Sequence, residues 1–437
     1  MMKKIFCIIA FFIVLSPLSA LDLSSTESSL ADIFSSSIDD NEGCTVFRSM
    51  NIPSGGRTEA LGTAFTAIAD DSSFFDYNPA ASAVLENTEI SVSHNAWIAD
   101  SALETIALTR RNGSLGYGTQ FKCFYVPFSE YNLYGDRVTG NYYSETSATF
   151  NIAYNFFSGY TFRGLALGAN GKIAWRNVPD YTDNKSDQVI SGSGLEQSAL
   201  GLMADGGILL RFNALKFYSD REPNIKIGLT LNNFGIALTG FGKEIKKDDD
   251  TPARITMASS YRIAPRLLLS AEVRKPVAIS NFSSSGALSI AAGLEATVTP
   301  IFAFQCGFLL QGSNPRFSIG SEFDIKGIKM DIAYILDLTS SANPANHISL
   351  SAKMRFGDRG RKATMEKVDE YYLSGLKFYA NGYYNEAIDL WNQAIYLASS
   401  SPLNIRFEPA IQARNSAYNF IKNKTELEDI YSVVVED

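Results

Sequence analysis

Apolar and polar residues alternate with a period of two over most of this chain. In the segment 163–176, Leu165 and Ile173 occupy one set of alternate positions, and Lys172 and Arg176 occupy the other. A period of two places successive side chains on opposite faces of a β-strand. The pattern therefore predicts strands with one apolar and one polar face. It recurs in 225–233, 266–274 and 288–298.

About fourteen such segments can be delimited. Their length is close to the ~9–11 residues that a tilted transmembrane strand needs, whereas strands of soluble proteins have a mode of about 5–6 residues. An even strand number is also typical of single-chain bacterial barrels. The predicted spans are 88–98, 103–111, 114–126, 145–158, 163–176, 198–212, 223–233, 253–263, 266–275, 286–298, 301–311, 315–323, 328–338 and 347–356.

The charged face of these strands decides which way they point. A Lys or Arg side chain facing lipid at the bilayer midplane costs about 2–4 kcal/mol. The charges therefore point into a lumen and the apolar face points to lipid. A soluble β-sandwich would have the opposite sense, with the same period. Strand length and number favour an all-β transmembrane barrel of about fourteen antiparallel strands.

Turn signals and polar stretches separate the spans. Asn112-Gly113 is a tight hairpin turn, and prolines mark two more turns at 264–265 and 299–300. The charged run 243–250 (KEIKKDDD) is interpreted as a solvated loop. The longer polar connections lie at 127–144, 177–197, 239–252 and 276–285.

The N-terminus predicts export. Lys3 and Lys4 precede an apolar stretch, 5–15, and Ala20 offers a cleavage site, so residues 1–20 read as a signal peptide. Residues 21–50 are rich in Ser and acids and are predicted to be a flexible segment. No later stretch approaches 18 apolar residues, so an exported chain would enter a bilayer only as a closed barrel. The predicted location is the outer membrane, in contact with its lipid.

Composition narrows the function classes. The net charge of −8 argues against nucleic-acid binding. The 21 Tyr, 29 Phe and 32 Gly suit twisted strands with aromatic girdles. No phosphate-loop, dinucleotide or zinc spacing is present, so we expect no cofactor and no metal. After signal removal, Cys44, Cys123 and Cys306 remain, isolated and odd in number. One disulfide bridge among them stays open, and small apolar fillers are the favoured interpretation.

A glycine-dotted stretch, 52–84, precedes the first strand. Its apolar spacing predicts a short helix over 58–69. The adjacent acids Asp70 and Asp71 suggest either a hard-cation site or a polar turn, and the turn is favoured because further ligands are not evident. Asn78-Pro79 marks a turn, because the ring of Pro79 restricts the residue before it.

This stretch resembles the N-terminal signature of FadL-type outer-membrane transporters of long-chain fatty acids, including their PorV-like and spirochaetal relatives. The resemblance implies a fourteen-stranded barrel whose N-terminal segment, 51–86, folds into the lumen of the barrel, 87–357, as a hatch. It implies that Gly62, Asp70, Asp71, Asn78, Pro79 and Ala80 place and gate this hatch. The residues that carry it are Arg57, Leu61, Gly62, Phe65, Ile68, Ala69, Asp70 and Asp71, followed by Tyr77, Asn78, Pro79 and Ala80.

A C-terminal extension departs from the plain fatty-acid transporters. Residues 363–424 predict a helical domain, on the periplasmic side, that begins with a tetratricopeptide-like hairpin over 364–399. A third helix, 408–422, would cover the hairpin, and 425–437 would form a tail. Residues 364–422 either dock a periplasmic protein or cap the barrel. The residues that match the repeat pattern are Gly375, Tyr379, Gly382, Tyr384, Ala387, Trp391 and Ala394.

Three functions follow from these features. The first is passive, hatch-gated uptake of long-chain fatty acids or similar hydrophobic molecules, which predicts a continuous apolar pocket lined by Phe, Leu and Ile. The second is a PorV-like scaffold or shuttle for exported proteins. The third, disfavoured, is a barrel enzyme, which would need His94 or His347 beside a hydroxyl and an acid. No catalytic residue is predicted.

Overall fold

The computed structural model describes residues 45–435, except 99, 133, 160–161, 184–187, 219–221, 281–285, 312–313, 339–345 and 359. The predicted signal peptide, Cys44 and most of the predicted flexible segment 21–50 lie outside the described residues.

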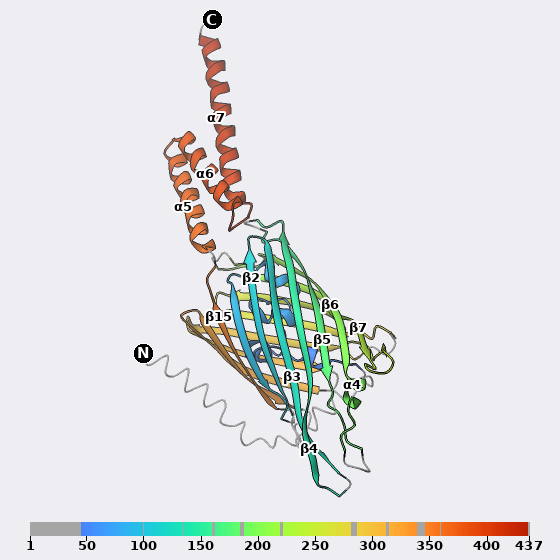
Figure 1. The fold of residues 1–437 in the computed structure, drawn as a ribbon. Coiled ribbons are helices and arrows are strands. Elements are labelled where there is room, and N and C mark those ends of the chain that lie inside the picture. The colour runs from blue at the N-terminus through green and yellow to red at the C-terminus, as the bar shows by residue number, and fades with distance from the viewer. Residues whose placement is uncertain are drawn as a thin grey trace, which may run out of the picture.

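The strands form one antiparallel sheet that closes on itself (Figure 1). β1 pairs with both β2 and β15, and β6 pairs with β7, so the predicted fourteen-stranded barrel is confirmed. The two-residue strand β8, Lys246–Lys247, pairs with β7 at the rim and is not one of the barrel strands. The barrel strands are β1 Glu89–Ala96, β2 Ala102–Asn112, β3 Leu115–Tyr131, β4 Arg137–Phe156, β5 Leu165–Asn177, β6 Ala199–Phe212, β7 Ile225–Thr239, β9 Arg254–Ala264, β10 Leu267–Pro276, β11 Ser289–Thr299, β12 Phe302–Gln311, β13 Asn314–Ile325, β14 Ile328–Asp337 and β15 His347–Arg355.

Two predicted loops differ from the structure. The predicted connection 127–144 is mostly a β-hairpin, because β3 runs to Tyr131 and β4 begins at Arg137. Polar residues alternate with aromatic ones in this segment. The two strands stay paired with each other from Leu115–Tyr154 as far as Tyr131–Arg137, so the hairpin projects beyond the other strands. The connection between β5 and β6 contains a short helix, α4 (Ser193–Gln197).

The predicted direction of the strand faces is confirmed. Ile173 is 51% exposed on the outer surface, while the neighbouring Lys172 is 4% exposed inside the lumen. The outer face of the other strands likewise carries mainly Ile, Leu, Phe, Met and Val. A closed barrel leaves no strand edge unpaired, and an apolar outer surface suits lipid. The chain is thus built as an outer-membrane barrel.

Residues 45–85 fill the lumen, and this segment is the hatch. The predicted helix 58–69 is wrong, because Gly62 and Thr63 both have positive φ (60° and 68°) and end the helix at Ala60. The predicted flexible segment 21–50 extends too far, because Phe47 and Met50 are buried against the barrel wall. The hatch elements are η2 Arg48–Asn51, α3 Gly56–Ala60, η3 Ser72–Asp76 and η4 Pro79–Ala83.

Three helices follow the barrel: α5 (Arg361–Ala380), α6 (Tyr384–Ser399) and α7 (Glu408–Val435). Trp391 is buried between α5 and α6, where its Nε1 donates to the Tyr372 carbonyl at 3.2 Å. Gly375 faces this indole, and a Cβ there would lie 2.4 Å from its Nε1. The predicted tail 425–437 is helical up to Val435, since α7 continues through it and projects beyond α5 and α6 (Figure 1).

None of the helices in the described part of the chain is both long and apolar enough to cross a membrane.

The helices lie at one end of the barrel, here called the helix end, opposite the loop end where the β3–β4 hairpin projects (Figure 1). They are fixed there by hydrogen bonds. The Arg406 N–H donates to the Ser158 carbonyl in the β4–β5 connection at 3.0 Å. Arg361 donates to the carbonyl of Leu85, the last residue of the hatch, at 3.2 Å. The helical domain therefore contacts both the barrel and the hatch.

Candidate functional site

The hatch backbone lies directly against the barrel wall at strand glycines. A Cβ added to Gly116 would lie 2.1 Å from the Ser82 carbonyl carbon, and one added to Gly168 would lie 2.4 Å from the Pro79 oxygen. A Cβ on Gly307 would lie 2.0 Å from the nitrogen of Gly62. These atoms belong to the backbone and cannot rotate away. At these glycines, here called the glycine seats, the hatch backbone can approach the strand closely because no side chain stands between them.

Asn78 ties two parts of the hatch to the wall. Its Oδ1 accepts the Ala80 N–H at 3.1 Å and caps η4, where Pro79 is the first residue. Its Nδ2 donates to the carbonyls of Thr66 and Ile208, each at 3.1 Å. Asn78 is fully buried. The structure therefore places Asn78, Pro79 and Ala80 together at a point where hatch and β6 meet.

Replacing Asn78 with Ala should destabilise the seated hatch by about 2–3 kcal/mol, because it leaves buried polar groups without partners. Equilibrium urea unfolding of the refolded barrel, followed by tryptophan fluorescence, would measure this. Asn177→Ala, at the exposed end of β5, is the control and should stay within about 0.5 kcal/mol of the wild type. A similar value for the two variants would contradict the anchoring role of Asn78.

Arg57 is the centre of a buried ionic network between hatch and wall. Its side chain is only 4% exposed. The guanidinium contacts Asp70 of the hatch at 2.5 Å and Glu295 of β11 at 2.7 Å. It also lies 3.1 Å from Asp71 and 3.6 Å from Glu322 of β13. One cation from α3 thus joins the hatch to two strands.

A lysine completes the network on the other side. Lys353 of β15 contacts Asp71 at 2.7 Å and Asp331 of β14 at 2.9 Å. Asp71 also caps η3 by accepting the Ser73 N–H at 2.8 Å. Burial alone would raise the pKa of Asp70 and Asp71, but nearby cations outweigh it and hold both pKa values well below the usual range: Arg57 and Lys226 for Asp70, Lys353 and Arg57 for Asp71.

Sequence reasoning found part of this network. Asp70 and Asp71 lie together as predicted, but they bind side-chain cations and form more than a polar turn. Arg57 was part of the signature but was not predicted as a site residue, and Lys353 was missed. The signal that would have found Lys353 is its position on the lumen face of a strand, where a charge needs a partner.

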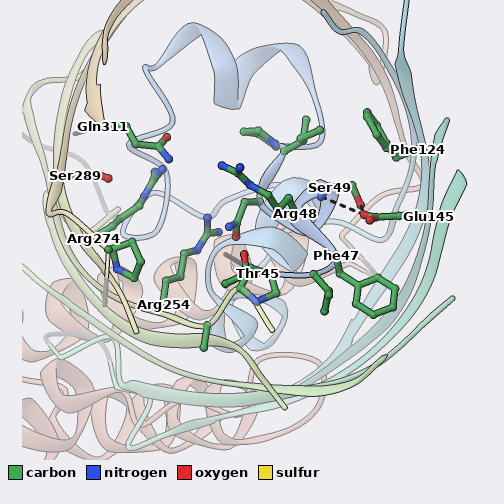
Figure 2. Close-up of a pocket in the computed structure, with 18 of the residues that line it drawn as sticks. Thr45, Phe47, Arg48, Ser49, Phe124, Glu145, Arg254, Arg274, Ser289 and Gln311 are labelled. Carbon is green, nitrogen blue, oxygen red and sulfur yellow. Dashed lines mark hydrogen bonds between the residues drawn. The ribbon is translucent and has the colours of Figure 1, made fainter. Parts of the chain in front are cut away.

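A cavity of about 950 Å³ lies between the hatch and the loop end. Figure 2 shows arginines on one side of it, among them Arg254 and Arg274, and Phe47 and Phe124 on the other. The lining is therefore mixed, and the predicted continuous apolar pocket of Phe, Leu and Ile is wrong. Other apolar residues of the lining are Val46, Trp97, Leu309 and Ile335.

The cavity arginines differ in what they bind. Arg274 donates to the Thr63 carbonyl and contacts Glu272. Arg254 donates to the Asp76 carbonyl at 2.8 Å. The guanidinium of Arg316, in contrast, has no hydrogen bond and no ion pair with the described residues. Arg316 is thus free to bind a ligand.

The charged run 243–250 is more than a solvated loop. Asp248, Asp249 and Asp250 line the cavity. Asp248 pairs with Arg176 at 2.8 Å, and Lys247 pairs with Asp250 at 3.2 Å. The run therefore closes one side of the cavity.

The two histidines lie in different places. His94 is on the outer surface, where its Nδ1 lies 2.7 Å from the Glu104 carboxylate, so it faces away from the cavity. His347 is buried beside the Trp97 ring, with Nε2 3.5 Å from Glu59. Cys123 and Cys306 are both free thiols.

A family model described as "Uncharacterised protein family (UPF0164)" matches residues 23–359. This chain belongs to the UPF0164 family. A UPF0164 protein of Treponema pallidum (strain Nichols) is 30% identical over 382 residues, covering 85% of this chain and 82% of the relative. The family is thus found in a spirochaete, which agrees with the branch that the signature resembled.

The barrel fold of this chain is similar to that of solved channel proteins. The CymD monoaromatic hydrocarbon channel matches with a TM-score of 0.50 at 12% identity, covering 70% of this chain and 98% of the channel. A Pseudomonas aeruginosa FadL homologue matches with a TM-score of 0.44 at 11% identity, covering 70% and 98%. At 12% identity, the likeness to CymD shows the shared barrel fold alone.

Proposed function

We propose that this UPF0164 protein takes up hydrophobic molecules with an acidic head group, such as long-chain fatty acids, across the outer membrane. The observation that carries the proposal is the cavity between loops and hatch, with an apolar wall and the unpaired Arg316. Its volume of about 950 Å³ is that of a small-molecule site. The shared fold of a hydrocarbon channel motivates the class of ligand.

In this proposal the loop end faces the outside and the helix end faces the periplasm. The ligand enters the cavity, its chain lies against Phe124, and its carboxylate binds Arg316. The hatch blocks the lumen beyond this point, since its backbone contacts the wall at the glycine seats. Passage therefore requires the hatch to move, and Gly62, Asp70, Asp71, Asn78, Pro79 and Ala80 are the residues whose contacts hold it.

Arg316→Gln should weaken binding of a fluorescent long-chain fatty acid about tenfold. A charge-assisted hydrogen bond contributes about 1.5–3 kcal/mol, and each 1.4 kcal/mol is a factor of ten in affinity. Titration of the refolded full chain in a neutral detergent would measure the change. Because Arg316 has no partner in the hatch, the fold should be unaffected.

Arg176→Gln provides the matched control for this titration. Arg176 lines the same cavity, but its charge is already neutralised by Asp248. The dissociation constant of Arg176→Gln for the fatty acid should lie within about twofold of the wild-type value. Equal loss in both variants would indicate a general charge effect, and the absence of saturable binding by folded protein would count against uptake of this ligand class.

The helical domain favours a second candidate, the PorV-like scaffold. It is attached to the barrel at the helix end, and α7 projects beyond the hairpin (Figure 1). Leu373, Tyr396 and Leu427 are 55%, 71% and 66% exposed on it. A chain truncated after Gly357 separates the two functions. Undiminished fatty-acid uptake, together with loss of exported proteins that co-purify with the full chain, would favour the scaffold as an additional role.

A further inference from the structure

A histidine and a glutamate form a pair on the outer surface of the barrel. His94 of β1 and Glu104 of β2 are direct neighbours in the register of the sheet. The Nδ1 of His94 lies 2.7 Å from the Oε1 of Glu104, and the two side chains are 46% and 45% exposed. Neither Nε2 of His94 nor the second oxygen of Glu104 has a hydrogen bond or ion pair within the described part of the chain. Each partner therefore keeps one polar atom unused.

The pair stands inside the apolar belt of the barrel. Apolar side chains or small residues follow it on both strands, toward the helix end and toward the loop end, and on the strands to either side. An aqueous boundary on one side of the pair would instead bring further polar residues. The outward-facing neighbours are Val92, Ile106, Ala96, Ile348, Leu350 and Cys123.

Lipid cannot satisfy the unused atoms of this pair. The hydrocarbon region offers no hydrogen-bond donor or acceptor, so an unpartnered polar group there costs free energy. Ionisable side chains within a membrane accordingly face protein and pair with one another. A partner that covers His94 and Glu104 must therefore lie in the membrane and bring both a donor and an acceptor.

We infer that the outer face of β1 and β2 is a contact surface for a second copy of this chain, in which His94 of each copy meets Glu104 of the other. A patch that carries a donor beside an acceptor is complementary to itself after a half-turn, as a symmetric dimer requires. A protonated histidine donates from both ring nitrogens. Nδ1 of His94 can thus hold its own Glu104 while Nε2 donates to that of the second copy.

The half-turn also determines which neighbours meet. Along the paired row of the sheet, the outward residues follow in the order Leu350, His94, Glu104 and Cys123. The second copy presents the same row in reverse, so Leu350 of each copy lies opposite Cys123 of the other. Packed sheet faces are ~10 Å apart, a gap that a short bismaleimide cross-linker spans between two thiols.

Cross-linking of the full chain in phosphatidylcholine vesicles tests this geometry. The variant Leu350→Cys keeps the native Cys123, and Cys44 and Cys306 are replaced by serine. Bismaleimidoethane should convert this variant to a covalent dimer on denaturing gels. Met257→Cys in the same background is the control, because Met257 is 64% exposed on the outer face of β9, on the opposite wall of the barrel. It should stay monomeric.

Two further changes to the Leu350→Cys variant show whether the pair itself holds the dimer. His94→Leu with Glu104→Leu should lower the cross-linked fraction about tenfold, because close charge pairs across an interface change affinity by at least that factor. His94→Glu with Glu104→His is the matched control. It exchanges the two groups and preserves their self-complementarity, so the cross-linked fraction should be unchanged.

Three outcomes would overturn the inference: no covalent dimer from Leu350→Cys, equal cross-linking of Met257→Cys, or equal cross-linking after loss of the His94–Glu104 pair. Laurate titration of the same samples keeps this result separate from the proposed uptake. The cavity and Arg316 lie inside the barrel, so the double-leucine variant should bind laurate as the parent does.

Discussion

Replacing Arg57 with Met should unseat the hatch at a cost of about 3–5 kcal/mol, the range measured when one partner of a buried ion pair is removed. The substitution keeps an unbranched side chain but leaves Asp70, Glu295 and Glu322 close together without their shared cation. The barrel strands pair with each other and do not need the hatch to close. We therefore expect a folded barrel with a displaced hatch.

Two measurements detect this outcome. In urea unfolding, the free energy of unfolding of Arg57→Met should be lower than that of the wild type by the contribution of the hatch contacts. In planar-bilayer recordings, Arg57→Met should show ion conductance that the wild type lacks. Arg57→Lys is the matched control, because it keeps the charge and loses the two-point contacts with Glu295 and Asp70. Arg57→Lys should recover part of the stability that Arg57→Met loses. Equal unfolding and equal conductance for Arg57→Met and wild type would show that the network does not hold the hatch.

The same network determines how the stability of the hatch in the lumen changes with pH. Against the effect of burial, the pKa of Asp70 is lowered in the folded chain chiefly by Arg57, and that of Asp71 by Lys353 and Arg57. Their contribution is therefore fully present above the unfolded value of about 3.9 and is lost as the pH falls below it. Hatch seating should be constant near neutral pH.

The barrel could be predicted closely from the sequence because each strand is recognisable from the residues of its own segment. Alternation with a period of two sets the strand and its facing, and the predicted spans such as 266–275 agree with β10, Leu267–Pro276, within a residue. The β3–β4 hairpin was missed because Pro127 and the polar residues after it read as a loop, whereas pairing between the two strands continues past them.

The candidate site was harder to predict because its contacts are distant in sequence. Lys353 meets Asp71, and no local pattern connects them. The hatch helix 58–69 was mispredicted for a related reason. Its apolar spacing suits a helix, but Leu61, Phe65 and Ile68 are all buried by wall and hatch together. When every side of a segment is buried, apolar spacing no longer reports helical periodicity.

Gly168→Val should also displace the hatch, and for a purely steric reason. A Cβ at Gly168 would lie 2.4 Å from the Pro79 oxygen and 2.5 Å from the Ala80 nitrogen. Overpacking of this kind typically costs about 1–3 kcal/mol, and valine adds two further methyl groups. Valine favours strands, so any loss reflects the contact with the hatch and not weaker strand formation.

Gly171→Val in the same strand isolates that contact. A Cβ at Gly171 meets nothing within 4 Å, because this residue lies on the outer face of β5. We expect Gly171→Val to match or exceed the wild type in urea unfolding, and Gly168→Val to lose about 3 kcal/mol and gain ion conductance. If both valines are tolerated equally, the hatch does not lie against β5 and the lumen is open in solution. If only Gly168→Val conducts, the hatch is the barrier that any transported molecule must displace.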